Sequence, residues 1–342
     1  MAASDPILQL QWRPFQLALP QPLLTARGVI GAKRGWLLRL EAADGAVGWG
    51  EAAPLDGALP LLQPTAAALA GLGSACRRSA LEAALAAGGL AGPLAFGLGC
   101  ALAELDGLPQ GRWRPAPAPA ALLPAGEAAL AVLQRREASG QALTGPPGST
   151  WKWKVAVYPD AEERAVLEQL LELLPADARL RLDANGGWDR PTAWRWAERL
   201  AAEPRLDWLE QPLPPSDGPG LAALAATVPV ALDESLQADP ALVHTWLGWQ
   251  VRRPSQEGDP RPLLAALTAG RPRWMLSTAF ETGIGRRWLA HLAALQAEGP
   301  TPAAPGLAPG WQPEGGLASG DPLAVWEAAG GLDGAPGEAD PC

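Results

Sequence analysis

Five ionisable side chains occupy four places along the chain that are about one strand and one helix apart. Lys152 and Lys154 lie two residues apart in the segment WKWKVAV, and Asp183, Glu210 and Asp233 each end a later apolar run. Three carboxylates that converge on one place repel one another unless a cation lies between them. Oxygen ligands without histidine or cysteine favour a hard cation, so these residues predict a Mg²⁺ site.

The two lysines predict a general base beside that metal. Side chains alternate across a strand, so Lys152 and Lys154 share one face while Trp153 between them takes the other. Each cation makes protonation of the other less favourable, which lowers the pKa of a lysine until its neutral amine can accept a proton. A metal and a base together can remove a proton next to a carboxylate and stabilise the resulting enediolate.

Each of these features also has a simpler explanation. A lone Lys-x-Lys pair is usually a solvated strand edge, and any one of the three acidic residues could be the N-cap of a helix that follows a strand. The N-cap explanation fits three residues in register with Lys154 poorly. Glu234, beside Asp233, is expected to make hydrogen bonds around the site, and Asn185 could be a turn residue.

An alternation of short apolar runs and helical stretches, from about residue 121 to 300, would position these side chains. The runs are 121–124, 151–157, 179–183, 206–210, 228–233, 249–253 and 274–278. Seven βα units in series predict a parallel sheet closed into a (β/α) barrel, whose active site lies at the C-terminal ends of its strands. A doubly wound open sheet is the alternative, but no G-x-G-x-x-G follows the first strand.

The first 110 residues have a different pattern, which predicts a small α+β unit. Two expected strands flank a turn at 43–45 and two expected helices follow, and the ranges are 35–40, 46–51, 65–72 and 79–85. The Pro/Ala-rich segment 111–120 is typical of a stiff linker. We therefore expect a capping domain over 1–110, joined by part of the tail 310–342, and a barrel over 111–309.

Composition excludes several classes of protein. The chain has 342 residues and a formal net charge of −9 without a basic run, which argues against nucleic acid as a partner. No apolar run predicts a membrane span and no signal peptide is visible, so we expect a cytoplasmic protein. Three scattered cysteines and two histidines in apolar stretches argue against a disulfide framework, a zinc site and a histidine-based triad. The oligomeric state stays open.

In this order, the residues resemble those of the enolase superfamily, and the Lys-x-Lys pair resembles its muconate-lactonizing subgroup. A mandelate-racemase type would need a catalytic histidine, which neither histidine here is placed to supply. Other segments are similar to the o-succinylbenzoate synthase family over nearly the whole chain. They are RPFQLALPQPLLTARG (13–28), GWGEAAPL (48–55), ALLPAG (121–126), LRLDANGGW (180–188), LDWLEQPLP (206–214), VALDESL (230–236) and STAFETGIG (277–285).

The resemblance implies a fold and a reaction. The fold is an α/β, modified (β/α)7β TIM-like barrel under an N-terminal α+β capping domain. The reaction is the Mg²⁺-dependent dehydration of a small-molecule carboxylate, 2-succinyl-6-hydroxy-2,4-cyclohexadiene-1-carboxylate, to o-succinylbenzoate in menaquinone and phylloquinone synthesis.

The resemblance also implies roles for single residues. Lys154 would be the general base and then the acid that protonates the departing hydroxyl, and Lys152 would set its pKa and contact the substrate. The Mg²⁺ ligands would be Asp183, Glu210 and Asp233. The residues expected to bind or cap the substrate are Ser277, Thr278, Asn185 and, in the loop at 25–28, Arg27.

One position departs from the family. The sixth strand usually carries a second lysine before a proline, and here the chain has Arg252, Arg253 and then Pro254. Arginine is effectively always protonated, so it is a poor base, although it can still stack on a planar intermediate as a cation. A racemase or epimerase needs bases on both faces of its substrate, whereas a syn elimination needs one. Arg253 therefore favours the dehydration, and it also raises the prospect of reduced activity.

Two other functions stay open. One is a different enolase-superfamily activity, such as a cycloisomerase, an N-succinylamino-acid racemase or a dipeptide epimerase. The other is a catalytically silent barrel that binds a metabolite or a partner. Complete retention of the expected ligands and of Lys154 argues against a silent barrel, because such a protein has no need of them.

Overall fold

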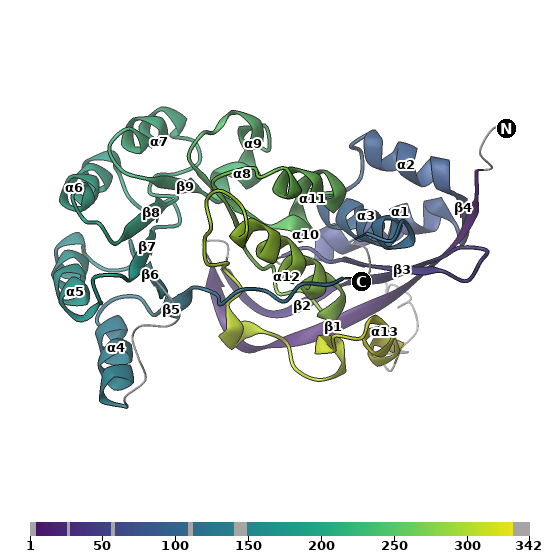
Figure 1. Ribbon diagram of the computed structural model, residues 1–342, viewed down its shortest axis with the longest axis horizontal. Helices are drawn as coiled ribbons and strands as arrows, with labels where there is room; N and C mark the ends of the chain where they lie inside the picture. Colours follow the sequence, from purple (N-terminus) through teal and green to yellow (C-terminus); the bar gives the residue numbers. More distant parts are fainter. Residues whose placement is uncertain (1–4, 26–27, 56–58, 109–111, 140–148, 331–342) are drawn as a thin grey trace, which may run out of the picture.

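The computed structural model describes residues 5–25, 28–55, 59–108, 112–139 and 149–330. Figure 1 shows two bodies side by side. An antiparallel sheet with its own helices forms one, and a curved parallel sheet surrounded by helices forms the other. This arrangement is the predicted α/β barrel with an N-terminal α+β unit, and the doubly wound alternative is wrong.

The N-terminal sheet has the strand order β3-β2-β1-β4. Its strands are β1 (Ile7–Thr25), β2 (Gly28–Glu41), β3 (Val47–Ala52) and β4 (Ala75–Arg77), and its helices are α1 (Leu59–Leu72), α2 (Arg78–Ala86) and α3 (Gly92–Leu105). The predicted turn between β2 and β3 is present, with Gly45 at φ +86°. Strand β1 was not predicted, because its prolines are unfavourable inside a sheet, yet its leucines alternate into the core.

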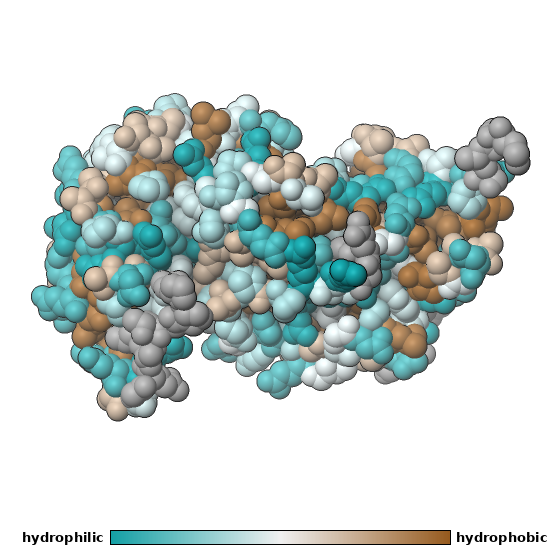
Figure 2. Space-filling model, in the orientation of Figure 1, coloured by the Kyte–Doolittle hydropathy of each residue, from teal (hydrophilic) through white to brown (hydrophobic). Residues whose placement is uncertain are grey.

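Helix α3 packs directly against β3, and two glycines make this possible. A Cβ atom at Gly48 would lie 1.9 Å from the Ala101 carbonyl oxygen, and one at Gly50 would lie 1.9 Å from that of Gly97. Within the described residues, no helix is both long enough and apolar enough to span a membrane. On the face shown in Figure 2, hydrophilic side chains cover much of both bodies and hydrophobic ones appear in separate areas.

The seven predicted barrel strands all form, in sequential parallel order. They are β5 (Ala121–Leu123), β6 (Thr150–Lys154), β7 (Arg179–Asp183), β8 (Leu206–Glu210), β9 (Val230–Leu232), β10 (Trp249–Arg252) and β11 (Trp274–Leu276). A very short eighth segment closes the ring. The Gly306 amide donates to the Leu276 carbonyl at 2.8 Å, and the Pro305 carbonyl accepts from the Ala120 amide at 3.0 Å. Residues 305–306 thus bridge β11 to the start of β5.

Helices surround this ring, as the alternating pattern predicted. They are α4 (Ala128–Ala138), α5 (Asp160–Leu173), α6 (Arg190–Leu200), α7 (Gly218–Ala225), α8 (Glu234–Ala238), α9 (Leu242–Thr245), α10 (Pro254–Glu257), α11 (Pro260–Thr268) and α12 (Gly283–Ala297). Trp151 and Trp153 of β6, and Val155 directly after it, are buried against the helix side chains, including Trp196 of α6. The intervening lysines therefore face the barrel interior, as expected.

The C-terminal segment returns to the first domain through α13 (Pro322–Gly330), beyond the short turns η1 (Pro309–Trp311) and η2 (Gly316–Ala318). Trp326 packs edge-on to Trp49 of β3 with ring centroids 5.7 Å apart, and the Arg13 guanidinium lies 4.6 Å over the Trp326 ring. The tail helix thus belongs to the packing of the N-terminal sheet.

Replacement of Trp326 by alanine should lower the free energy of unfolding by about 3 kcal/mol, because the buried ring leaves a cavity between α13 and β3. Urea unfolding followed by circular dichroism measures the loss. Leu323→Ala in the same helix is the control, since Leu323 is half exposed and should cost under about 0.5 kcal/mol. Equal losses in both variants would show that α13 is not docked by Trp326.

Candidate active site

Strand register places the predicted chemical residues in one row at the mouth of the barrel. Lys154 pairs with Asp183 across β6 and β7, and Asp183 pairs with Glu210 across β7 and β8. The Lys152 ammonium lies between two of the acids, 2.7 Å from Asp183 Oδ2 and 2.7 Å from Glu210 Oε1. All three acidic side chains are buried, and Glu210 is completely so.

The third acid, Asp233, has a different cation. Arg253 donates to it twice, from Nη2 to Oδ2 at 2.6 Å and from Nε to Oδ1 at 3.2 Å. Its remaining terminal nitrogen donates to the Thr278 carbonyl at 2.7 Å. Arg252, by contrast, points away, where it pairs with Glu257 and lies over the Trp274 ring at 4.3 Å. The two arginines are therefore distinguished, and Arg253 is the one that faces the site.

The helix-capping explanation fails for Asp233. This residue occupies the N-cap position of α8, but its side chain makes no capping hydrogen bond. Its carboxylate instead accepts from Arg253 and, at 2.9 Å, from Gln237 Nε2. Asp183 accepts from the Asn185 amide at 3.1 Å, which is a local turn contact and leaves its other oxygen for Lys152.

The two lysines are unequal. Burial disfavours the charged form of Lys152, but the carboxylates of Asp183 and Glu210 outweigh it and raise the pKa of Lys152 above its ordinary value. Lys152 is therefore held as a cation, in agreement with the expectation that Lys154 and not Lys152 is the base. The Lys154 ammonium is partly buried and makes no ion pair or hydrogen bond to any described residue. Lys152 is thus the fixed cation, and Lys154 is the amine left available at the mouth.

Negative charge is in excess around this row. Burial, with the charges of Asp183 and Asp233 adding to it, raises the pKa of Glu210 despite Lys152. Burial and the same two aspartates raise the pKa of Glu234 to about 7. Asn185 Nδ2 donates to Glu234 Oε1 at 3.0 Å, whereas Glu234 Oε2 is buried without a hydrogen-bond partner in the described part of the chain.

This chemistry suits a hard divalent cation. The side chains are carboxylates that lie at the ends of adjacent strands. Their negative charges repel one another, and a bound cation would offset that repulsion. Among the described residues, however, no three acidic, histidine or cysteine side chains are gathered around one point as ligands. The reason is visible in the pairing, since Lys152 and Arg253 draw the acids to two separate cations. The donors fit Mg²⁺, and their role as its ligands stays a prediction.

The other predicted residues lie close by, with one exception. Ser277 is buried and its hydroxyl donates to the Gly306 carbonyl at 3.3 Å, while the Thr278 hydroxyl donates to Glu281 Oε2 at 2.6 Å. Arg27 lies outside the described residues. His291 is remote from the row and accepts from the Arg114 amide at 3.3 Å, in agreement with a structural role.

Two buried residues missed by the sequence analysis fix the turns after the barrel strands, at the mouth of the barrel. Gln211 Oε1 accepts from the Asp233 amide at 3.2 Å and the Ser235 amide at 3.0 Å, which fixes the turn that carries Asp233. Glu281 accepts from the residues around Thr278. In the sequence, each is a polar residue shortly after an apolar run, in the segments LEQP and FETG. That position after a strand was the signal that could have identified them.

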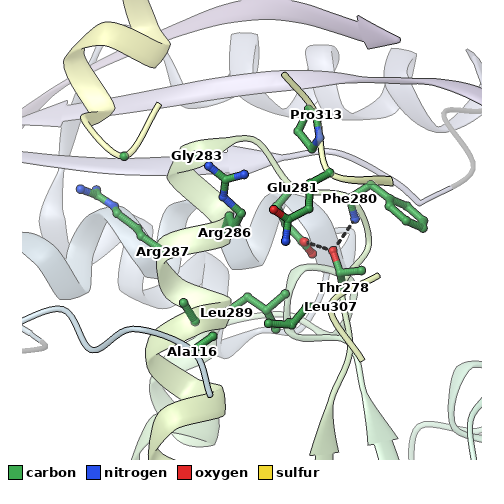
Figure 3. Close-up of a pocket in the computed structure, with 13 residues that line it drawn as sticks. Ala116, Thr278, Phe280, Glu281, Gly283, Arg286, Arg287, Leu289, Leu307 and Pro313 are labelled. Atoms are coloured by element: carbon green, nitrogen blue, oxygen red, sulfur yellow. Dashed lines mark hydrogen bonds between the residues drawn. The ribbon is translucent and has the colours of Figure 1, made fainter. Parts of the chain in front are cut away.

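A cavity of about 270 Å³ adjoins this edge (Figure 3). Its wall includes Thr278, Phe280 and Glu281 from the loop after β11, with Leu289 of α12 and Leu307 facing them. None of the residues that line it is a lysine or one of the three acids in the row. The cavity therefore lies beside the row of lysines and acids, and Thr278 is the predicted substrate-binding residue that it shares with the site.

Known proteins share this architecture and much of this sequence. A family model described as enolase C-terminal domain-like matches residues 135–246, the part of the barrel that runs from α4 to α9. The o-succinylbenzoate synthase of Thermosynechococcus vestitus is 38% identical over 304 residues, covering 83% of this chain and 88% of that protein. That of Enterobacter sp. strain 638 is 32% identical and covers 73% and 76%.

A solved structure agrees. The o-succinylbenzoate synthase from Thermosynechococcus elongatus BP-1, complexed with Mg in the active site, superposes with a TM-score of 0.74 and 33% identity over 94% of this chain and 98% of that one. The chain belongs to the o-succinylbenzoate synthase family.

Removal of the Lys152 charge should destabilise the protein in the absence of metal, because two buried carboxylates would face each other. For Lys152→Met in EDTA we expect a loss of about 3–5 kcal/mol in the free energy of unfolding. Lys154→Met is the control on the same strand and face, and should change little. If the two variants unfold at the same urea concentration, the carboxylates are not held by Lys152.

Proposed function

We propose that this chain is an o-succinylbenzoate synthase, a hydro-lyase that dehydrates 2-succinyl-6-hydroxy-2,4-cyclohexadiene-1-carboxylate to o-succinylbenzoate in menaquinone or phylloquinone synthesis. The observation that carries the proposal is the row at the barrel mouth, where Lys154 lies in register with Asp183 and Glu210 and has no partner in the described part of the chain. Membership of the family supports the same activity.

Roles follow from the contacts of each side chain. We assign Mg²⁺ binding to the carboxylates of Asp183, Glu210 and Asp233, because they are buried oxygen donors in a region of excess negative charge. When bound, Mg²⁺ stabilises negative charge on a substrate carboxylate. Lys152, held as a cation, orients two of these carboxylates and presents a positive charge to the substrate.

Lys154 moves the protons. Its neutral amine takes the proton from the carbon next to the ring carboxylate, and the electron pair of the broken C–H bond enters the ring. The ammonium so formed gives its proton to the hydroxyl that leaves the neighbouring carbon, which departs as water. The lysine ends in its starting state, and the ring becomes aromatic. A single base on one face is sufficient for this syn elimination.

Arg253 supports the one-base reaction. Despite burial, the Asp233 carboxylate raises the pKa of Arg253 above its ordinary value, so the guanidinium stays protonated. A racemase or epimerase, which needs a second base on the opposite face, is therefore disfavoured. We assign Arg253 the role of a fixed cation beside the substrate, with Ser277, Thr278, Asn185 and Arg27 as the residues that surround it.

The domain division supports a closed site. We propose that residues 1–110, with part of 310–342, cap the barrel of residues 111–309, since α13 packs on the N-terminal sheet. We also propose a cytoplasmic location, for which the free thiols of Cys76 and Cys100 are suited to a reducing compartment.

The purified protein with Mg²⁺ should convert the cyclohexadiene acid to o-succinylbenzoate, followed by the loss of diene absorbance and by identification of the product. EDTA should abolish the reaction and added Mg²⁺ should restore it. Lys154→Ala should lower kcat by at least about 100-fold, because the proton has no other acceptor. Failure of the wild-type protein to turn over this substrate would remove the assignment and favour the silent barrel.

Arg253 leads to a second expectation. With an N-succinylamino acid in deuterated water, the wild-type protein should not produce the opposite enantiomer, because the face of Arg253 carries no base. Proton NMR and chiral chromatography measure exchange and racemisation together. Deuterium appearing in both enantiomers would contradict the one-base assignment and favour the racemase alternative.

A further inference from the structure

Lys33 is the one lysine that the proposed reaction does not use. It lies on β2 in the N-terminal domain and is only 1% exposed. A buried ammonium is costly unless anionic or carbonyl groups compensate it. Its partners therefore indicate what the charge is for.

Those partners join the two domains. Lys33 Nζ is 3.7 Å from Glu51 Oε1 on β3, and it donates a hydrogen bond to the Ala279 carbonyl in the loop after β11. Glu51 Oε2 in turn accepts from the Thr282 amide at 2.8 Å and from the Thr282 hydroxyl at 2.6 Å. A Cβ atom at Gly285 would lie 2.8 Å from that same oxygen, so a glycine is needed for Glu51 to reach the start of α12.

A second buried carboxylate completes the group. Glu281 accepts from the Ser255 hydroxyl at 2.6 Å, the Ala279 amide at 2.8 Å and the Thr278 hydroxyl at 2.6 Å. Burial raises the pKa of Glu51, and burial would do the same for Glu281. For Glu281, however, the Lys33 charge and these hydrogen bonds hold the pKa below its ordinary value. One ammonium thus serves two carboxylates in the domain interface.

The same loop continues to the active site. The Thr278 hydroxyl accepts from the Phe280 amide at 2.8 Å, and Phe280 has φ +62°, a left-handed conformation that costs free energy in a residue with a side chain. The Thr278 carbonyl accepts from Arg253, which holds Asp233. A continuous set of contacts therefore runs from Lys33 to an expected Mg²⁺ ligand.

We propose that Lys33 is a positioning residue: through the Ala279 carbonyl and Glu281 it fixes the loop of residues 277–282, so that the Thr278 carbonyl holds Arg253 and Asp233 in their working orientation. Lys33 thereby sets the geometry of the barrel mouth without itself touching the substrate. The catalytic part of this inference rests on the proposed function. The part that concerns Mg²⁺ affinity does not depend on which substrate is used.

The test compares Lys33→Met with the wild-type protein by two readouts. Steady-state kinetics should show kcat lowered by about tenfold, with a smaller change in KM, and calorimetric titration with Mg²⁺ should show Kd raised by about tenfold, since supporting groups around metal ligands have effects of this size. Leu40→Ala is the matched control, because Leu40 is equally buried on the same strand but packs against α3-side residues. It should lose stability and retain both constants.

A double variant separates positioning from charge balance. Lys33→Met with Glu51→Gln removes one positive and one negative charge, so it should recover stability, while kcat and the Mg²⁺ Kd stay impaired because the Ala279 carbonyl still lacks its donor. Recovery of both constants would overturn the proposal, as would wild-type constants in Lys33→Met. Where Lys33→Met does not fold, Glu281→Gln keeps the side-chain volume and should shift the same constants, and unchanged values would overturn the proposal.

The two proposals fail in different ways. If the wild-type protein leaves the cyclohexadiene acid unchanged, the proposed function falls, while a raised Mg²⁺ Kd in Lys33→Met still supports the positioning role. If the wild type is active and Lys33→Met equals it, the positioning role falls alone. A wild-type protein that binds no Mg²⁺ would overturn both.

Discussion

The structure depends on one electrostatic constraint: buried carboxylates at the ends of adjacent parallel strands must be compensated. Parallel register places Asp183 beside Glu210, and Asp233 follows on the next strand, so the fold itself brings like charges together. Lys152 forms ion pairs with Asp183 and Glu210, and Arg253 forms one with Asp233, at distances of 2.6–2.7 Å. Because leaving such charges unpaired costs several kcal/mol, these cations decide which way each carboxylate points. A divalent ion at this place would act on the same charges.

The sequence alone was sufficient to predict the features that depend on a local pattern of residues. Alternation in WKWKVAV separated the tryptophans that pack on helices from the lysines that face inward, and each of the seven barrel strands formed at its predicted run. It was insufficient where a residue's role depends on partners far along the chain. Strand β1 contains three prolines, which a sheet usually excludes: Pro14 is paired with Trp36 of β2, whereas Pro20 and Pro22 lie where the register with β2 shifts. Gln211, Glu281 and Lys33 are polar and buried, and their contacts lie 22 to 246 residues away or across a tight loop.

Around the site and the domain interface, lysine and arginine make different kinds of contact. Only three of the 27 basic residues are lysine. The ammonium of Lys152 pairs with two carboxylates, and that of Lys33 pairs with Glu51 and also lowers the pKa of Glu281 through its charge. A planar guanidinium suits a single carboxylate held through two hydrogen bonds, which is the contact that Arg253 makes with Asp233. Lys154 is the exception, without such a partner among the described residues, and its proposed role as base needs a lysine because arginine stays protonated.

The two domains meet through the same type of interaction that organises the site. Glu51 of the N-terminal sheet binds the first amides of α12, where the helix dipole favours a negative charge, and Lys33 offsets that charge from the same sheet. Burying three charged groups in an interface is weak as a source of stability, since apolar side chains could pack there at lower cost. It is effective as a source of orientation, because each hydrogen bond in the group is favourable only over a narrow range of directions. The interface therefore fixes where the loop after β11 lies, and that loop carries the carbonyl to which Arg253 is bound.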